Sequence, residues 1–181
     1  MRMLKPCLGL FVLFTVAILG GCARNTKSPD VSAKIRKSLQ DAGFKDVTVS
    51  QDRTAGVVTL GGHIGSDADK TQAESIAKSN AQGQVVADEI AVLPSGEEHD
   101  AKSVNSDLDK AIDKNLDAAL IQNHLNRAVS YDVKNGVVTL KGDVNSESKR
   151  AEAEQIASSV PNVHQVVNDV QIKNQKASSS K

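Results

Sequence analysis

The sequence contains few cysteines and few aromatic residues. Its two cysteines, Cys7 and Cys22, both lie near the N-terminus, so the remaining chain can form neither a disulfide framework nor a cysteine-based zinc site. Aromatic residues make up 2% of the chain, and only Phe44 and Tyr131 lie beyond position 22. This scarcity excludes an aromatic platform for stacking bases or sugars.

The chain also lacks an excess of charge of either sign, because 22 lysines and arginines balance 22 aspartates and glutamates. Arg2 and Lys5 lie in a segment that we expect to be removed, which leaves the mature protein slightly acidic. A general nucleic-acid binder needs a basic face to displace counterions. We therefore expect no nucleic-acid partner.

Sequence motifs of catalysis and metal binding are missing as well. The histidines are scattered, without a spacing such as H-E-x-x-H, and no G-x-S-x-G nucleophile elbow occurs. The glycine-rich residues 56–65 lack the Gly-Lys-Ser/Thr ending of a phosphate-binding loop. We expect no catalytic residues, no metal site and no cofactor, and we predict that the protein is not an enzyme.

Residues 1–21 have the features of an export signal. Arg2 and Lys5 form a basic start, and residues 8–19 form an apolar run of about a dozen residues, which is short for a membrane-spanning helix. Residues 22–29 follow as a polar segment with no apolar period, and we expect a flexible tether.

The apolar run ends in a short motif that carries a cysteine, Leu19-Gly20-Gly21-Cys22. This motif resembles the bacterial lipobox, in which the cysteine receives diacylglycerol before cleavage. The resemblance implies lipid attachment at Cys22. Ala23 follows in place of the aspartate that marks inner-membrane retention, which implies the outer membrane. The alternative is an ordinary signal peptide with an incidental cysteine.

The rest of the chain is a tandem repeat. Residues 136–142 read Gly-Val-Val-Thr-Leu-Lys-Gly, and residues 56–62, eighty positions earlier, read Gly-Val-Val-Thr-Leu-Gly-Gly. The same offset holds for about thirty further residues. A constant offset across successive elements indicates a duplication. We place the two domains at residues 30–94 and 106–173.

Each repeat predicts the order helix, strand, strand, helix, strand. In the first repeat, the apolar residues of 31–39 are spaced by four, residues 47–49 and 57–64 alternate as strands do, and residues 84–93 form the last strand. Ser66 and Asp69 predict the cap of the second helix. In the second repeat, Asn135-Gly136 predicts a two-residue hairpin.

These elements predict an α+β fold with two helices packed on one face of a small three-stranded mixed sheet in each repeat. The hairpin strands would be antiparallel, and the strands that flank the second helix would be parallel. Residues 95–105 contain proline, glycine and a charge cluster, and we expect a linker without an ordered element. The Ser- and Lys-rich tail, 174–181, is predicted to be disordered.

In both repeats the glycine motif is followed by a helix with Ala-Glu-x-Ile-Ala and then by Val-x-Asn/Asp-x-Ile/Val. This pattern resembles the BON domain, a small αββαβ module named after bacterial osmotic-stress (OsmY-like) and nodulation proteins. The first repeat has Asp88 where the second has Asn168, which matches the asparagine common in the family. The glycines that match the family's structural positions are Gly56, Gly62, Gly136 and Gly142.

A lipobox followed by two such domains resembles the dual-BON outer-membrane lipoproteins. The resemblance implies a non-enzymatic, lipid-anchored protein of the cell envelope that faces the periplasm and supports envelope integrity or osmotic-stress tolerance. It also implies that the second domain binds anionic membrane phospholipid. Docking of other envelope proteins, through a sheet edge or the groove between the repeats, is the alternative.

Four basic residues of the second repeat are candidates for contact with phospholipid headgroups. Lys134 and Lys141 flank the expected hairpin, and Lys149 and Arg150 begin the helix that follows. If they share a face, each would contribute about 1 kcal/mol near an anionic surface. The alternative is ordinary surface charge.

The first helix of the second repeat offers a rival contact surface. Leu108, Ile112, Leu116 and Leu120 lie on one helical stripe, and we expect them in the core. Ile121 lies off this stripe, so we expect it to be exposed and count it as a further candidate for membrane contact.

Overall fold

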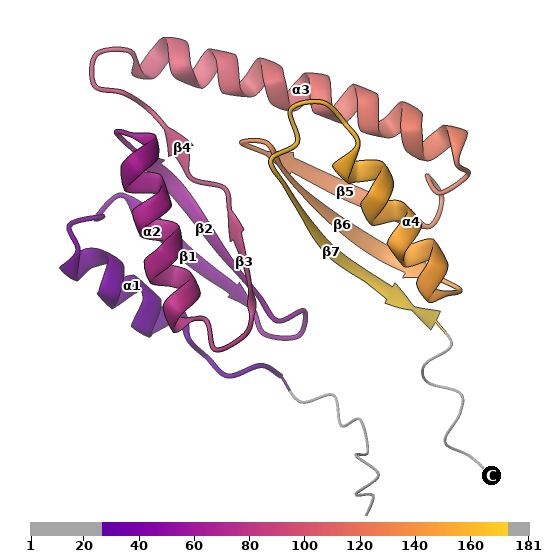
Figure 1. The fold of residues 1–181 in the computed structure, drawn as a ribbon, viewed down its shortest axis with the longest axis horizontal. Coiled ribbons are helices and arrows are strands. Elements are labelled where there is room, and N and C mark those ends of the chain that lie inside the picture. The colour runs from indigo at the N-terminus through magenta and orange to yellow at the C-terminus, as the bar shows by residue number, and fades with distance from the viewer. Residues whose placement is uncertain (1–26, 174–181) are drawn as a thin grey trace, which may run out of the picture.

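The computed structural model describes residues 27–173. The predicted signal peptide, the lipobox with Cys22 and the predicted tail lie outside the described residues. Two small α/β units lie side by side, joined by one long helix (Figure 1). Within residues 27–173, no helix combines the length and the apolar character needed to cross a membrane.

The first domain follows the predicted order, with one change in its last strand. β2 pairs antiparallel with β1 and parallel with both β3 and β4. The predicted strand 84–93 is therefore two short strands, interrupted at Glu89 and Ile90. The elements are α1 (Ser32–Asp41), β1 (Val47–Asp52), β2 (Val57–Ile64), α2 (Asp67–Asn80), β3 (Val85–Asp88) and β4 (Ala91–Val92).

The second domain repeats this topology with an unbroken last strand. β6 pairs antiparallel with β5 and parallel with β7. This confirms the predicted fold class, two helices on a small mixed sheet in each repeat. The elements are α3 (Glu98–Gln122), β5 (Val129–Lys134), β6 (Val137–Val144), α4 (Glu147–Ser158) and β7 (Gln165–Ile172).

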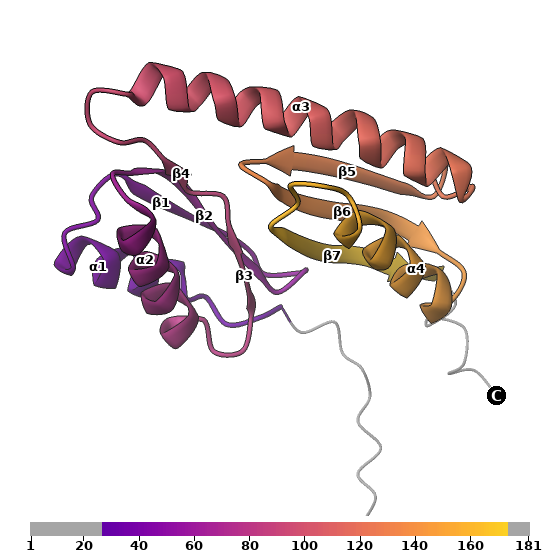
Figure 2. The same cartoon turned by 45° about the horizontal axis from the view of Figure 1, so that its top comes forward.

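The predicted linker at residues 95–105 is wrong from Glu98 onward, because α3 begins there. The carboxylate of Glu98 accepts the N–H of Gly96 at 3.0 Å, and acidic residues in the first turn are favourable at the positive end of a helix dipole. The charge cluster that indicated a linker is thus the first turn of a helix. Figures 1 and 2 show α3 passing from the region of β4 to its packing position on the second domain.

A helix cap and two glycines with positive φ define the local structure of the repeats. Ser66 Oγ accepts the N–H of Asp69 at 3.2 Å and so caps α2, as the sequence predicts. Gly62 and Gly142 both have positive φ, at 90° and 127°. A Cβ on Gly142 would run into the carbonyl oxygen of Ala128, so no other residue fits there.

Each domain has its own aliphatic core between its helices and one face of its sheet. The helices contribute small side chains that allow close approach, among them Ala73 and Ala77 in α2. In α3 the predicted stripe is buried from Ile112 to Leu120, but the core prediction is wrong for Leu108, which is exposed at 38%. The second core comprises Ile112, Leu116, Leu120, Leu125, Val129, Val138, Leu140, Val144, Ala153, Ala157, Val160 and Val170.

Candidate functional site

The two domains meet through the sheet faces that their helices leave uncovered. Successive strand residues point to opposite faces, so Val57 and Ala87 point away from the first core, and Val137 and Val167 point away from the second. These four side chains form a third apolar cluster, in which Ala87, Val137 and Val167 are buried and Val57 is partly buried. The sequence did not predict which faces would pair.

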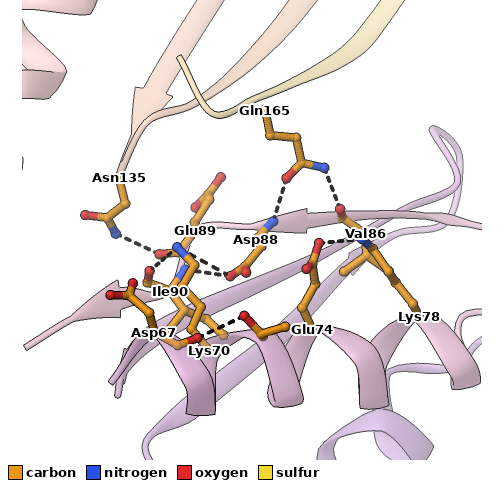
Figure 3. A network of polar contacts seen from close by, with 11 residues as sticks. Asp67, Lys70, Glu74, Lys78, Val86, Asp88, Glu89, Ile90, Asn135 and Gln165 are labelled. Carbon is orange, nitrogen blue, oxygen red and sulfur yellow. Dashed lines mark hydrogen bonds and ion pairs between the residues drawn. The ribbon is translucent and has the colours of Figure 1, made fainter. Parts of the chain in front are cut away.

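Gln165, at the start of β7, binds the outer edge of β3 (Figure 3). Its Nε2 donates to the carbonyl of Val86 at 2.7 Å, and its Oε1 accepts the N–H of Asp88 at 3.0 Å. In a slanted parallel ladder, one residue bonds the two groups on either side of the residue opposite it. The carboxamide of Gln165 therefore replaces one residue of a parallel strand and closes this edge.

Glu89, in the break between β3 and β4, holds the hairpin of the second domain. Its carbonyl accepts Nδ2 of Asn135 at 2.7 Å, and its carboxylate lies 3.2 Å from Nζ of Lys134. The Glu89 side chain is only 12% exposed, so this ion pair is better shielded than a surface pair. From α3, the carboxylate of Asp109 accepts the N–H groups of Asn135 and Gly136, both at 2.9 Å.

Asp88 is the one buried charged residue in the part of the chain that the structure describes, at 7% exposure. Its Oδ1 accepts the N–H of Ile90 at 3.1 Å, and Nζ of Lys70 lies 4.0 Å away, donating to the Ile90 carbonyl at 2.8 Å. Burial raises the pKa of Asp88, and the charge of Lys70 only partly opposes this. Figure 3 shows the carboxyl between β3 and the α2 residues.

Asn168 occupies the equivalent position in the second domain. Its Oδ1 accepts the N–H of Val170 at 3.2 Å, as Asp88 does for Ile90. Its Nδ2 also donates twice into α4, to the Arg150 carbonyl at 3.1 Å and to Oε2 of Glu154 at 2.9 Å. The amide thus joins β7 to α4, with every polar atom of the side chain bonded.

The four basic candidates do not share one face. Lys134 and Lys141 lie on the uncovered sheet face toward the first domain, because they alternate with core residues along β5 and β6. Asp52 of the first domain has a lowered pKa, chiefly through the N–H groups of Ala55 and Thr54, and to a smaller extent through the charge of Lys141.

Lys149 and Arg150 lie instead in the first turn of α4. Lys149 pairs with Glu152 at 2.8 Å on the surface. Arg150 faces Glu147 at 3.4 Å and donates to the Asn168 carbonyl at 3.3 Å, so it also has a structural role at the edge of β7.

Ile121 is exposed, as expected, at 48% of its surface. It ends α3 at the end of the second domain opposite the hairpin, where α4 begins, so Ile121 and Lys149 belong to the same end of the helical layer (Figure 1). Arg127 is exposed in the loop that follows α3. Among residues 27–173, no three His, Cys, Asp or Glu side chains are arranged to hold a metal ion.

Comparisons with known proteins agree with this topology. The chain matches the BON domain family over residues 27–94 and 106–174. It belongs to the BON domain family. The osmotically inducible protein Y of Escherichia coli (strain K12) is 30% identical over 146 residues, covering 79% of this chain and 71% of that protein.

Two solved structures of CdsD, a structural protein of the type III secretion system of Chlamydia trachomatis, also align with this BON protein. Both are 14% identical and cover 78% of this chain, with TM-scores of 0.32 and 0.33. The chain spans 65% of the first structure and 61% of the second, less than two thirds of either.

Gln165, Asp88 and Glu89 were not predicted as site residues. One sequence signal was available, because the repeat offset pairs Gln165 with Val85. A polar residue at a strand position that is apolar in the other repeat indicates a contact that only one domain makes.

Proposed function

We propose that this BON protein is a non-enzymatic, lipid-anchored protein of the cell envelope that rests on anionic phospholipid through the far end of its second domain. The observation that carries the proposal is the exposed Ile121 in the last turn of α3, at the same end of the second domain as the first turn of α4, which contains Lys149; the exposed Arg127 lies in the loop that follows α3. An exposed aliphatic residue and cations at one end of a domain suit a surface that offers both acyl chains and charged headgroups.

The charge balance at this end permits such contact. The pair of Lys149 with Glu152 is exposed, and exposed pairs contribute little, so Lys149 can exchange its partner for a phosphate at small cost. Lys134 and Lys141 face the first domain and are not part of the proposed surface. The acyl chains expected on Cys22 would supply the larger share of membrane affinity.

The cellular role follows from the relative. Because the similar protein of Escherichia coli is named as osmotically inducible, we propose that this protein supports the envelope, in the outer membrane facing the periplasm, under osmotic stress.

Vesicle flotation tests the lipid contact. The mature Cys22→Ser protein is expected to float with vesicles of zwitterionic lipid containing phosphatidylglycerol, more strongly as the anionic fraction rises and more weakly in high salt. Reversing Arg127 and Lys149 to Glu removes about 2 kcal/mol of attraction and adds repulsion, so partitioning should fall by at least about thirtyfold. Ile121→Ser should weaken binding about tenfold.

Matched variants give the controls. Lys34→Glu with Lys37→Glu makes the same charge change on α1 of the first domain, and Val104→Ser removes an aliphatic side chain that is 57% exposed earlier on α3. Equal losses in the test and control variants would show that charge or apolarity in general, and not this end of the domain, determines binding.

A groove between α3 and β5 favours docking of envelope proteins as a second candidate function. It is lined by Lys110 and Asp113 of α3 and by Tyr131 and Asp132 of β5. Docking on the edge of β3 is disfavoured, because Gln165 occupies it. Absence of flotation together with capture of a defined envelope protein would favour this candidate.

A further inference from the structure

The two domains treat one equivalent position differently. The repeat offset of eighty aligns Asp88 with Asn168 on the last strand and Glu74 with Glu154 on the second helix. Both strand side chains bond the N–H two residues later through Oδ1. Only the amide of Asn168 then reaches the helix as a donor, at 2.9 Å from Glu154.

An ionised Asp88 cannot copy that contact, because a carboxylate has only acceptor oxygens. The Glu74 carboxylate, which pairs with Lys78, raises the pKa of Asp88 by its like charge, after the larger effect of burial. A protonated carboxyl, in contrast, has one O–H to donate. In the neutral acid, Asp88 has the same acceptor and one of the donors that Asn168 uses.

We propose that Asp88 is a proton-controlled clamp between β3 and α2, which closes on Glu74 when the carboxyl is protonated and is opened by like charge when it is ionised. The proton comes from solvent and forms an O–H bond on Asp88, which then donates to the Glu74 carboxylate, and no other covalent bond changes.

The charged groups around Asp88 lie on α2 and on its own segment. Lys70 and Lys78 on α2 favour its ionised form, while Glu74 on the same helix opposes it. β2, which pairs with β3 at Leu60, has no Asp, Glu, Lys or Arg over 57–64, and its one titratable side chain, His63, is exposed. On its own segment the next residue is Glu89, which is neutralised by Lys134 of the second domain.

The clamp is connected directly to the domain junction. The backbone N–H of Asp88 is the group that donates to Gln165, and the next residue, Glu89, accepts Asn135 and pairs with Lys134. The segment 86–89 thus carries the polar contacts of the first domain with the second. Tightening this segment against α2 by protonation also steadies the edge to which the second domain binds.

The linkage has a definite sign. Because the pKa of Asp88 in the folded protein is raised above 3.8, its contribution to stability is full at low pH and is lost as pH rises through the folded value. The first domain should therefore gain protection as pH falls through the folded pKa of Asp88 toward 3.8.

Exchanging the two residues tests the proposal in the full mature protein. Asp88→Asn supplies the amide permanently, so amide hydrogen exchange in α2 and β3 should slow at pH 7, and its added dependence on pH above 3.8 should vanish. Asn168→Asp should transfer that dependence to α4 and β7, with weaker protection at pH 7 than at pH 5. The unfolding midpoint of the affected domain should move by about 5 °C in each case.

The control is Asp41→Asn, which makes the same charge change on an exposed carboxylate of α1 that pairs with Lys37. It should leave the pH dependence of the first domain as in the wild type. The proposal is overturned if Asp88→Asn keeps the wild-type pH dependence, or if the effect of Asn168→Asp is the same at pH 5 and pH 7. Site-resolved exchange keeps the two domains distinguishable even when they unfold in one transition.

Discussion

Replacing Gln165 with leucine should loosen the domain junction without harming either core. The side chain lies outside both aliphatic cores, and its role in the structure is the pair of hydrogen bonds to Val86 and Asp88. A typical hydrogen bond contributes about 1 kcal/mol net, so losing both should weaken the junction by about 2 kcal/mol. That is about a thirtyfold rise in the open population.

The assay is amide hydrogen exchange at Asp88, whose N–H is covered by Gln165 in the closed junction. Exchange there should accelerate about thirtyfold in Gln165→Leu, while amides in α1 and α4 keep their protection. Gln171→Leu is the matched control, because Gln171 lies on the same strand and its amide donates only to oxygens of Asp169. Equal Asp88 exchange rates in the two variants would refute the reasoning.

Two further predictions concern single residues. Gly142→Ala should lower the free energy of unfolding by about 3 kcal/mol or more, because the new Cβ meets the Ala128 carbonyl. Gly83→Ala, also at positive φ but in open space, should lower it by about 1 kcal/mol. Denaturant titration measures both values. Tyr131, the single tyrosine, has its pKa raised to about 12 by burial and by the charges of Asp113 and Asp117. The absorbance of its phenol should therefore titrate near that pH. The stability that Tyr131 contributes should be lost as pH rises from 10 toward 12. A phenol that titrates near 10 would contradict the burial argument.

The fold could be predicted because the repeat shows each pattern twice. Apolar residues at spacings of four and two set the helices and strands, and the shared glycines fix the turns. Asn135-Gly136 predicted its hairpin correctly, since both residues adopt positive φ, at 48° and 77°. These signals are local, and local geometry is what periodicity records.

The junction could not be predicted in the same way. Periodicity shows that the side chains of Val57 and Val137 point away from their own cores, but it does not show that they belong to one cluster. A side chain that replaces a strand residue, as Gln165 does, leaves no periodic trace. The prediction that the basic candidates share a face failed for the same reason. Lys141 and Lys149 are close in the sequence, but Lys141 lies on a strand face and Lys149 on a helix.

The difference between Val85 and Gln165 explains why two domains form one unit. An uncovered strand edge invites pairing with another chain, and natural proteins block it. In the first domain the edge of β3 is blocked by Gln165 from the second domain. In the second domain, Arg150 binds one backbone group of β7, the Asn168 carbonyl.

The second domain therefore covers the edge of β3 in the first. The apolar cluster at the junction is small, and Gln165 adds directional hydrogen bonds to β3, on either side of Ala87. The first domain alone should retain its core but expose the edge of β3. Self-association of the isolated first domain, measured by size-exclusion chromatography, would follow from this uncovered edge.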